Sequence, residues 1–150
     1  MKHAGFWRRV LAYLIDILPI GIIITAIFYL FFGFDEVVNA RFSNPGDFNA
    51  RVDFLRIRNY IRDLSFAIWI IYSIIFESSK LQATYGKRLI GLTVVDKDGA
   101  QLSVFRSLGR NLFKFISLIV LGLGFVWVAF TKKKQGWHDL VAGTYIIMNR

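Results

Sequence analysis

The chain has 150 residues, of which 55% are hydrophobic and 17% aromatic, and this excess of apolar side chains is typical of a small integral membrane protein of one domain. Its net charge of +9 suits anionic lipid headgroups and not nucleic acid, because the basic residues are scattered along the edges of apolar segments. The lack of cysteine excludes disulfides and thiolate sites, and two histidines are too few for a metal cluster, so we expect no cofactor and no metal.

The first element is an apolar stretch that follows Arg8 and Arg9 and continues to Phe34 with a single charge, Asp16. About 20 apolar residues are enough for a helix to cross a bilayer, so we predict a membrane span over residues 8–33. A carboxylate within a span costs roughly 2.5–3.5 kcal/mol on insertion scales, so Asp16 is expected to face protein and to have a basic partner. Arg9 lies seven positions earlier on the same helical face and is the first candidate.

The position of Asp16 leaves two interpretations open. It is either a fixed member of a structural ion pair, or a site for a cation or proton, because a shielded carboxylate can hold a proton and release it when a cation approaches. Lys2, Arg8 and Arg9 precede the span, so the positive-inside rule places the N-terminus in the cytoplasm. The apolar run is too long for a cleaved signal peptide, and we expect it to remain as an anchor.

The middle of the chain is predicted to hold a loop and a second span. Residues 35–59 are polar, with a turn signal (NPGD) at residues 44–47, and we expect an extramembrane loop on the outer side. Thirteen uncharged residues, 64–76, then form the centre of a second span over residues 60–80. Glu77 at its inner end is a second candidate acid, interpreted as an interfacial residue.

Two stretches have the pattern of β-strands. Residues 89–104 alternate apolar and polar side chains around the turn sequence DKDG at residues 96–99, which predicts a β-hairpin. Lysines and arginines flank this hairpin and place it in the cytoplasm. A further strand is expected at residues 144–149, and because a strand of this length needs partners, we expect it beside the hairpin.

The third apolar segment covers residues 105–131, and the charges that follow it indicate whether it crosses the membrane once or turns back. A single crossing would leave the lysines at 132–134 outside, against the positive-inside rule, and would separate the two β-stretches. A helical hairpin or re-entrant loop that turns near residues 122–124 removes both conflicts. The predicted fold class is therefore a mainly α membrane protein, a helical bundle of three to four membrane segments with a small cytoplasmic β-element, forming one domain over residues 1–150.

Arg106, Arg110 and Lys114 recur every four residues and so form a basic stripe on one helical face. The stripe either contacts lipid headgroups, or it lets Arg110 enter the bundle and meet Asp16. Both readings stay open at the level of sequence.

The tail contains His138 and Asp139 directly after the basic cluster. Asp139 either caps a helical turn or pairs with Arg9 or Lys87, and a neighbouring His and Asp can also serve acid–base chemistry. No nucleophile motif accompanies them, so we do not expect an enzyme.

Three separated motifs resemble the RDD family: RVLAYLID at residues 9–16, TYGKRLIGLTVV at 84–95 and HDLVAGT at 138–144. They occur in the family's order and span nearly the whole chain. The resemblance implies that Arg9, Asp16 and Asp139 are the arginine and the two aspartates that name the family, with Arg8 as the competitor for the arginine. It also implies a transport role, linked in some relatives to sodium/proton exchange. The arginine-rich segment 35–62 is not part of the family pattern.

Our leading hypothesis is a multi-pass protein of a bacterial-type inner (plasma) membrane that moves or couples a small cation or proton at Asp16. Because one subunit with three to four membrane segments can hardly enclose an ion pathway, we expect a homo-oligomer surrounded by membrane lipid. In this mechanism Arg9 tunes proton binding at Asp16, and Asp139 closes the cytoplasmic side. The supporting residues are Arg8, Lys87, Arg110 and His138. The alternative is a non-transporting scaffold or accessory subunit, in which Arg9, Asp16 and Asp139 form a fixed polar lock and the loops bind a partner protein.

Overall fold

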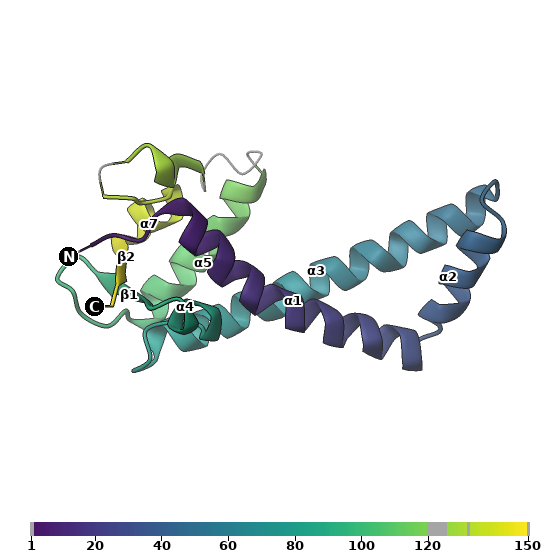
Figure 1. Ribbon diagram of the computed structural model, residues 1–150, viewed down its shortest axis with the longest axis horizontal. Coiled ribbons are helices and arrows are strands. Elements are labelled where there is room, and N and C mark those ends of the chain that lie inside the picture. Colours follow the sequence, from purple (N-terminus) through teal and green to yellow (C-terminus); the bar gives the residue numbers. More distant parts are fainter. Residues whose placement is uncertain (1, 120–125, 132, 150) are drawn as a thin grey trace. The chain divides into compact units, whose positions relative to one another are not determined.

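The structure is a computed structural model that describes residues 2–119, 126–131 and 133–149 (Figure 1). It is mainly helical, with one small sheet, and it divides into two compact units: Met1–Asp16 with Ile70–Arg150, called unit 1, and Ile17–Trp69, called unit 2. The elements are α1 (Phe6–Phe31), α2 (Phe34–Ser43), α3 (Phe48–Ser78), α4 (Tyr85–Leu89), β1 (Leu92–Asp96), α5 (Val104–Ile119), η1 (Trp127–Ala129), α7 (Trp137–Ala142) and β2 (Thr144–Met148).

Helix α1 forms where the apolar stretch predicts a span. It has 26 residues, so it is about 39 Å long and exceeds the thickness of the hydrocarbon core. Within the described ranges it is the one helix that is long and apolar enough to cross a membrane. Only Ala12 and Asp16 are buried on it. The structure therefore supports one membrane helix, and the three to four segments expected from the sequence stay a prediction.

Unit 2 corrects the extramembrane loop expected at residues 35–59, because this stretch is helical. The turn signal at residues 44–47 separates α2 from α3, and Asp47 Oδ1 accepts the backbone N–H groups of Asn49 (2.8 Å) and Ala50 (3.3 Å), which starts α3 well before residue 60. Aromatic side chains then hold the helices together: Phe54 packs against Phe34 and Phe42, with ring centroids 6.1 and 6.3 Å apart. The polar composition of the segment did not reveal this aromatic packing, and its position outside the membrane stays a prediction.

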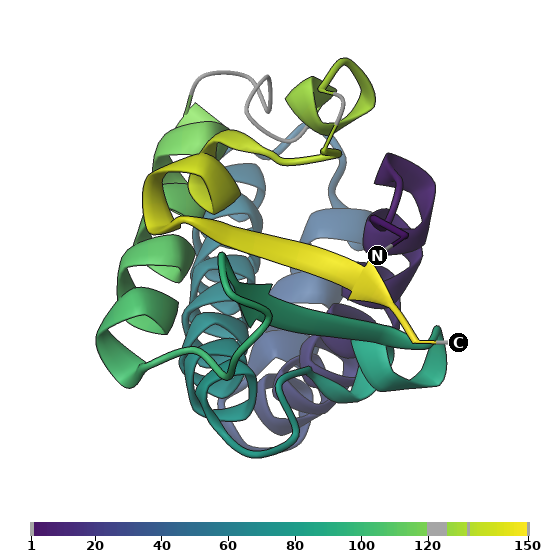
Figure 2. The same cartoon turned by 90° about the vertical axis from the view of Figure 1, so that its left-hand side faces the viewer.

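The sheet of unit 1 corrects the predicted hairpin at residues 89–104. β1 pairs in antiparallel fashion with β2, in a register from Leu92 opposite Met148 to Asp96 opposite Thr144 (Figure 2). The predicted second strand of the hairpin is not formed, because Asp96 Oδ1 accepts the backbone N–H groups of Asp98 and Ala100, both at 2.9 Å, and the chain then enters α5. The C-terminal strand takes the place of that second strand.

The N-terminal residues extend this sheet on the other edge of β2. The Ala4 N–H donates to the Ile146 carbonyl oxygen at 2.8 Å, and the Met148 N–H donates to the Lys2 carbonyl oxygen at 2.9 Å. The small apolar core of unit 1 lies here, formed by Ala4, Ala12, Leu92, Val94, Leu102 and Ile146. The sheet therefore joins the start of the chain to its end.

The helices of unit 1 have an inverted distribution of side chains. On α5 the buried residues are Ser107, Arg110, Asn111 and Lys114, whereas Phe105 is 85% exposed and Leu108 and Leu112 are also exposed. A helix of a water-soluble protein buries its apolar face instead. The inverted arrangement is the one expected of helices that contact lipid. The turn predicted near residues 122–124 lies outside the described residues.

Candidate functional site

Asp16 is held by three neutral donors of unit 1, one on α3 and two at the start of α4. Its Oδ2 accepts the Thr84 hydroxyl at 2.6 Å, and its Oδ1 accepts the Gly86 N–H at 2.7 Å and the Tyr72 hydroxyl at 3.4 Å. Tyr72 itself accepts the Tyr85 N–H at 2.7 Å, so its own proton points to Asp16. Asp16 is only 6% exposed, and these residues form what we call the Asp16 site.

Small residues create the close approach of α1 and α4 that this site needs. A Cβ atom on Gly86 would lie 2.2 Å from the Ala12 carbonyl oxygen and 3.0 Å from Asp16 Cγ. Ala12 is itself buried against α4, one turn before Asp16 on the same face. Glycine at position 86 and alanine at position 12 therefore bring the α4 backbone within hydrogen-bond distance of the carboxylate.

A second set of buried charges surrounds Glu77, the penultimate residue of α3. Glu77 Oε1 accepts Lys87 Nζ at 2.5 Å, with Lys114 Nζ at 3.8 Å. Its Oε2 accepts Arg110 Nη1 at 2.5 Å and Asn111 Nδ2 at 3.1 Å. Glu77 is fully buried within the protein, and its place at the membrane interface stays a prediction.

Arg110 links Glu77 to a second carboxylate, Asp139 on α7. The Arg110 Nε donates to Asp139 Oδ1 at 2.9 Å, while Asp139 Oδ2 pairs with Arg9 Nη1 and accepts the Gly136 N–H at 3.3 Å. Arg9 also donates to the Ala4 and Lys134 carbonyl oxygens. We call the group of Arg9, Glu77, Lys87, Arg110, Lys114 and Asp139 the ion-pair network. It connects α1, α3, α4, α5 and α7.

The electrostatics near Asp139 follow from its burial and its cationic neighbours. Burial alone would raise the pKa of Asp139, but the positive charges of Arg9 and Arg110 outweigh it and hold that pKa well below its usual value. His138 Nε2 lies 3.4 Å from Asp139 Oδ1. Burial lowers the pKa of His138 to about 3 despite the attraction of Asp139, so the imidazole is neutral at neutral pH and does not act as an acid–base pair with Asp139 in the usual range.

The structure joins the residues predicted from the sequence differently from the expected scheme. Among the residues that the structure describes, neither a lysine nor an arginine forms an ion pair with Asp16. Arg9 pairs with Asp139 instead, which was one of the alternatives for Asp139. Arg110 does enter the bundle, but it meets Glu77 and Asp139 and not Asp16. The reason is geometric, since α5 and α7 pack against each other and bring these groups together.

The supporting residues divide between the network and its surroundings. Lys87 belongs to the network through Glu77 and not through Asp139. Arg8 lies outside it, with its Nη1 directed to the Met148 sulfur at 2.7 Å. Across the described ranges, no group of three or more His, Asp and Glu side chains is arranged to hold a metal ion.

Sequence reasoning did not identify Thr84 and Gly86 as site residues, and it named Lys114 only as a member of the basic stripe, without its contact to Glu77. A usable signal was present on α5, where Ser107, Arg110, Asn111 and Lys114 follow the i, i+3, i+4, i+7 spacing of one helical face. Polar residues on one face of an otherwise apolar helix indicate a buried polar seam when the helix lies in lipid. For Thr84 and Gly86 the only signal was their place within the second motif.

Comparison with known proteins finds similarity along nearly the whole chain. The model of the RDD family matches residues 3–143. The chain is 33% identical to the uncharacterised protein YxaI of Bacillus subtilis (strain 168) over 152 residues, covering 97% of each chain. It is 29% identical to the uncharacterised protein YckC of the same organism over 150 residues, covering 97% of this chain and 84% of YckC. No solved structure matches this chain.

Proposed function

This chain belongs to the RDD family, and we propose that, as a membrane protein of that family, it works as a non-transporting scaffold or accessory subunit that a fixed polar lock holds in one shape. In this proposal the ion-pair network and the Asp16 site fix the membrane helix α1 to the rest of unit 1. The loops and the sheet then present one rigid surface to a partner protein.

The observation that carries this proposal is the saturation of the buried carboxylates. Both oxygens of Glu77 and both oxygens of Asp139 accept from fixed donors of the protein. Both oxygens of Asp16 do the same, with neutral donors. A transported cation would have to displace these donors, and two of them are arginines, which keep their charge under all physiological conditions.

The energetic cost of such displacement favours a static role. Removing one member of a buried ion pair leaves an uncompensated charge and costs about 3–5 kcal/mol. Arg110 is 1% exposed and compensates two carboxylates at once, so its movement would expose both. A lock of this kind stabilises one arrangement of the helices and resists the alternation that transport requires.

The inverted helices support a location within the lipid bilayer. Asp16 on α1, Glu77 on α3 and Arg110 on α5 are buried, while apolar side chains on the same helices are exposed. We infer that α3 and α5 contact lipid together with α1, which gives a multi-pass protein of a bacterial-type plasma membrane. Lys2 and the arginines before α1 support a cytoplasmic N-terminus.

A second candidate is cation/proton exchange, and one feature of the network favours it. Lys87 Nζ and Lys114 Nζ both approach Glu77 Oε1, at 2.5 and 3.8 Å. A buried lysine, unlike an arginine, can release its proton, so a proton could be exchanged at this oxygen. Exchange would then involve Glu77 and not the Asp16 predicted from the sequence.

Reconstitution into liposomes distinguishes these two functions. A pH-sensitive dye inside the vesicles reports proton flux after the addition of Na⁺, K⁺ or Li⁺, and protein-free liposomes give the background. The scaffold predicts no flux above background and no shift of the unfolding temperature with any of these cations. The scaffold proposal would be overturned if the wild-type protein shows flux and Lys114→Met abolishes it without changing the folded fraction. The exposed Lys80→Met is the matched control, because it removes the same charge outside the network.

A further inference from the structure

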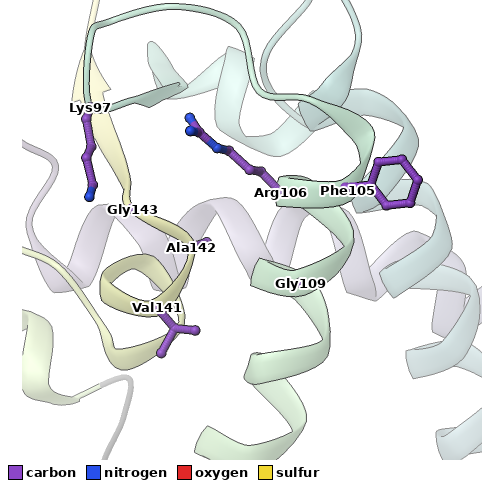
Figure 3. A pocket seen from close by; sticks show the side chains of 7 residues that line it. All are labelled: Lys97, Phe105, Arg106, Gly109, Val141, Ala142 and Gly143. Carbon is purple, nitrogen blue, oxygen red and sulfur yellow. The ribbon is translucent and has the colours of Figure 1, made fainter.

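A cavity of about 440 Å³ lies in unit 1, between the turn after β1, the first half of α5 and the junction of α7 with β2, and its lining shares no residue with the Asp16 site or the ion-pair network. Its lining includes Lys97, Phe105, Arg106, Gly109, Val141 and Gly143. Figure 3 shows the Arg106 side chain extending toward Lys97, while the Lys97 side chain runs toward Gly143. The cavity is therefore open to solvent and cationic.

The Lys97 side chain occupies space that the glycine at position 143 leaves open. Gly143 has a left-handed φ of +62°, and a Cβ atom there would lie 2.6 Å from Lys97 Cε. The lysine stem thus passes over the α7–β2 junction in space that a larger residue would occupy. The absence of a side chain at position 143 therefore leaves room for the Lys97 side chain beside the cavity.

Arg106 retains binding capacity in spite of its own ion pair. Its Nη1 contacts Asp96 Oδ2 at 3.1 Å, and its side chain is 51% exposed. The other oxygen of Asp96 is occupied by the backbone N–H groups of Asp98 and Ala100. A guanidinium has five N–H donors, so most of those of Arg106 face the cavity or solvent. An anion that enters meets two positive side chains and one carboxylate that is already bound.

The surroundings of the cavity are apolar. Phe105 is 85% exposed and Val141 is 58% exposed, and the exposed Leu108 and Leu112 continue the same apolar side of α5. A ligand that matches this surface has an anionic group for the cavity and a hydrocarbon part for the helix face. In a membrane protein the molecule with both parts is an anionic phospholipid.

We propose that this cavity binds the phosphate headgroup of an anionic phospholipid, with Lys97 and Arg106 as its ligands and the acyl chains along the exposed apolar side of α5. The site goes beyond the scaffold function, because it gives the protein a preference for one class of lipid. It is independent of transport and needs only that the chain is embedded in a membrane.

Native mass spectrometry of the detergent-solubilised full chain tests the proposal, with phosphatidylglycerol as the probe and phosphatidylcholine as the zwitterionic comparison. The double variant Lys97→Gln/Arg106→Gln removes the two cationic ligands. We expect about a fivefold loss of retained phosphatidylglycerol per charge removed, and so about 25-fold for the pair. The matched control is Lys80→Gln/Arg88→Gln, which removes one exposed lysine and one exposed arginine outside the cavity.

A second variant tests the cavity without changing its charge. A Cβ atom on Gly109 meets nothing within 4 Å, so we expect Gly109→Leu to place a bulky side chain in the cavity and to leave the fold intact. We expect this variant to retain several-fold less phosphatidylglycerol than wild type, even if the double variant folds poorly.

Three outcomes would overturn the proposal. The first is equal retention of phosphatidylglycerol by the cavity variants and the control variant. The second is equal retention of phosphatidylcholine and phosphatidylglycerol by wild type. The third is full displacement of the lipid by inorganic phosphate, which would make free phosphate the ligand.

Discussion

The Asp16 site and the ion-pair network solve the same physical problem in two ways. Both bury a carboxylate, which is costly unless the charge is compensated or fully hydrogen-bonded. Asp16 is held by hydroxyl and backbone N–H donors, whereas Glu77 and Asp139 are held by arginines and lysines. The neutral site therefore depends on close backbone packing, while the charged site depends on the presence of every partner.

The largest effect is expected from removing the arginine that bridges the network. Arg110→Met leaves Glu77 and Asp139 without their shared cation, and we expect a loss of about 3–5 kcal/mol in the free energy of unfolding. Denaturant titration of the detergent-solubilised protein measures it. The control is Arg56→Met, which removes the exposed ion pair with Asp53 and should cost at most about 1 kcal/mol. Equal effects of the two variants would contradict a stabilising role for the network.

The next effect concerns the packing on which the neutral site depends. Gly86→Ala places a methyl group against the Ala12 carbonyl oxygen. Because this oxygen belongs to the backbone of a packed helix and cannot move away easily, we expect a cost of about 1–3 kcal/mol. Gly109→Ala is the matched control, since its methyl group meets nothing within 4 Å and should be neutral or stabilise by up to about 1 kcal/mol. If both variants behave alike in thermal unfolding, α1 and α4 are not in close contact.

Replacing each buried carboxylate by its amide compares how much the two sites depend on charge. Asp16→Asn keeps an oxygen acceptor for Gly86 or Thr84, and the threonine hydroxyl can rotate to accept from the new amide, so we expect a loss of about 1–2 kcal/mol. Glu77→Gln leaves Lys87, Lys114 and Arg110 without their counter-charge and should cost more. The ratio of the two losses in the same unfolding assay is the measurement. A larger loss for Asp16→Asn would reverse our assignment of the two sites.

The last effect is a pH dependence confined to the charged region. The pKa of His138 is about 3 in the folded protein and near 6.5 when unfolded, so the unfolded state binds more protons between these values. Stability therefore falls as the pH drops below 6.5, by at most about 1.4 kcal/mol per pH unit. Partial burial also lowers the pKa of His3, so the variant His3→Gln serves as the background.

In that background, adding His138→Gln should remove the remaining slope of stability between about pH 4.5 and 6.5. Unfolding temperatures of the single and double variants across this range provide the test. A slope that persists in the double variant would mean that other groups titrate there. Below this range the lowered pKa of Asp139 adds a further loss of stability, in the same direction.

The sequence predicted which helix faces are buried better than it predicted which residues are in contact. The length of the apolar stretch predicted the length of α1. The cost of a charge in lipid predicted that Asp16 is buried. The spacing of Arg9 and Asp16 showed only that they share a helical face, separated by about 10 Å along the axis. Their true partners come from α7 and α4, and no local pattern encodes those contacts. The same limit explains the wrong hairpin, because β1 pairs with a strand near the end of the chain.

The contacts that tie the first residues to the last have a consequence for biogenesis. Arg9 and Asp139 are 130 positions apart, and Ala4 pairs with Ile146. While the ribosome is still elongating the chain, α1 emerges long before either partner exists, so the anchor enters the membrane with its arginine uncompensated. Unit 1 can be assembled only after Asp139 and Ile146 have been synthesised, so a chain that terminates before Asp139 would be inserted but not assembled.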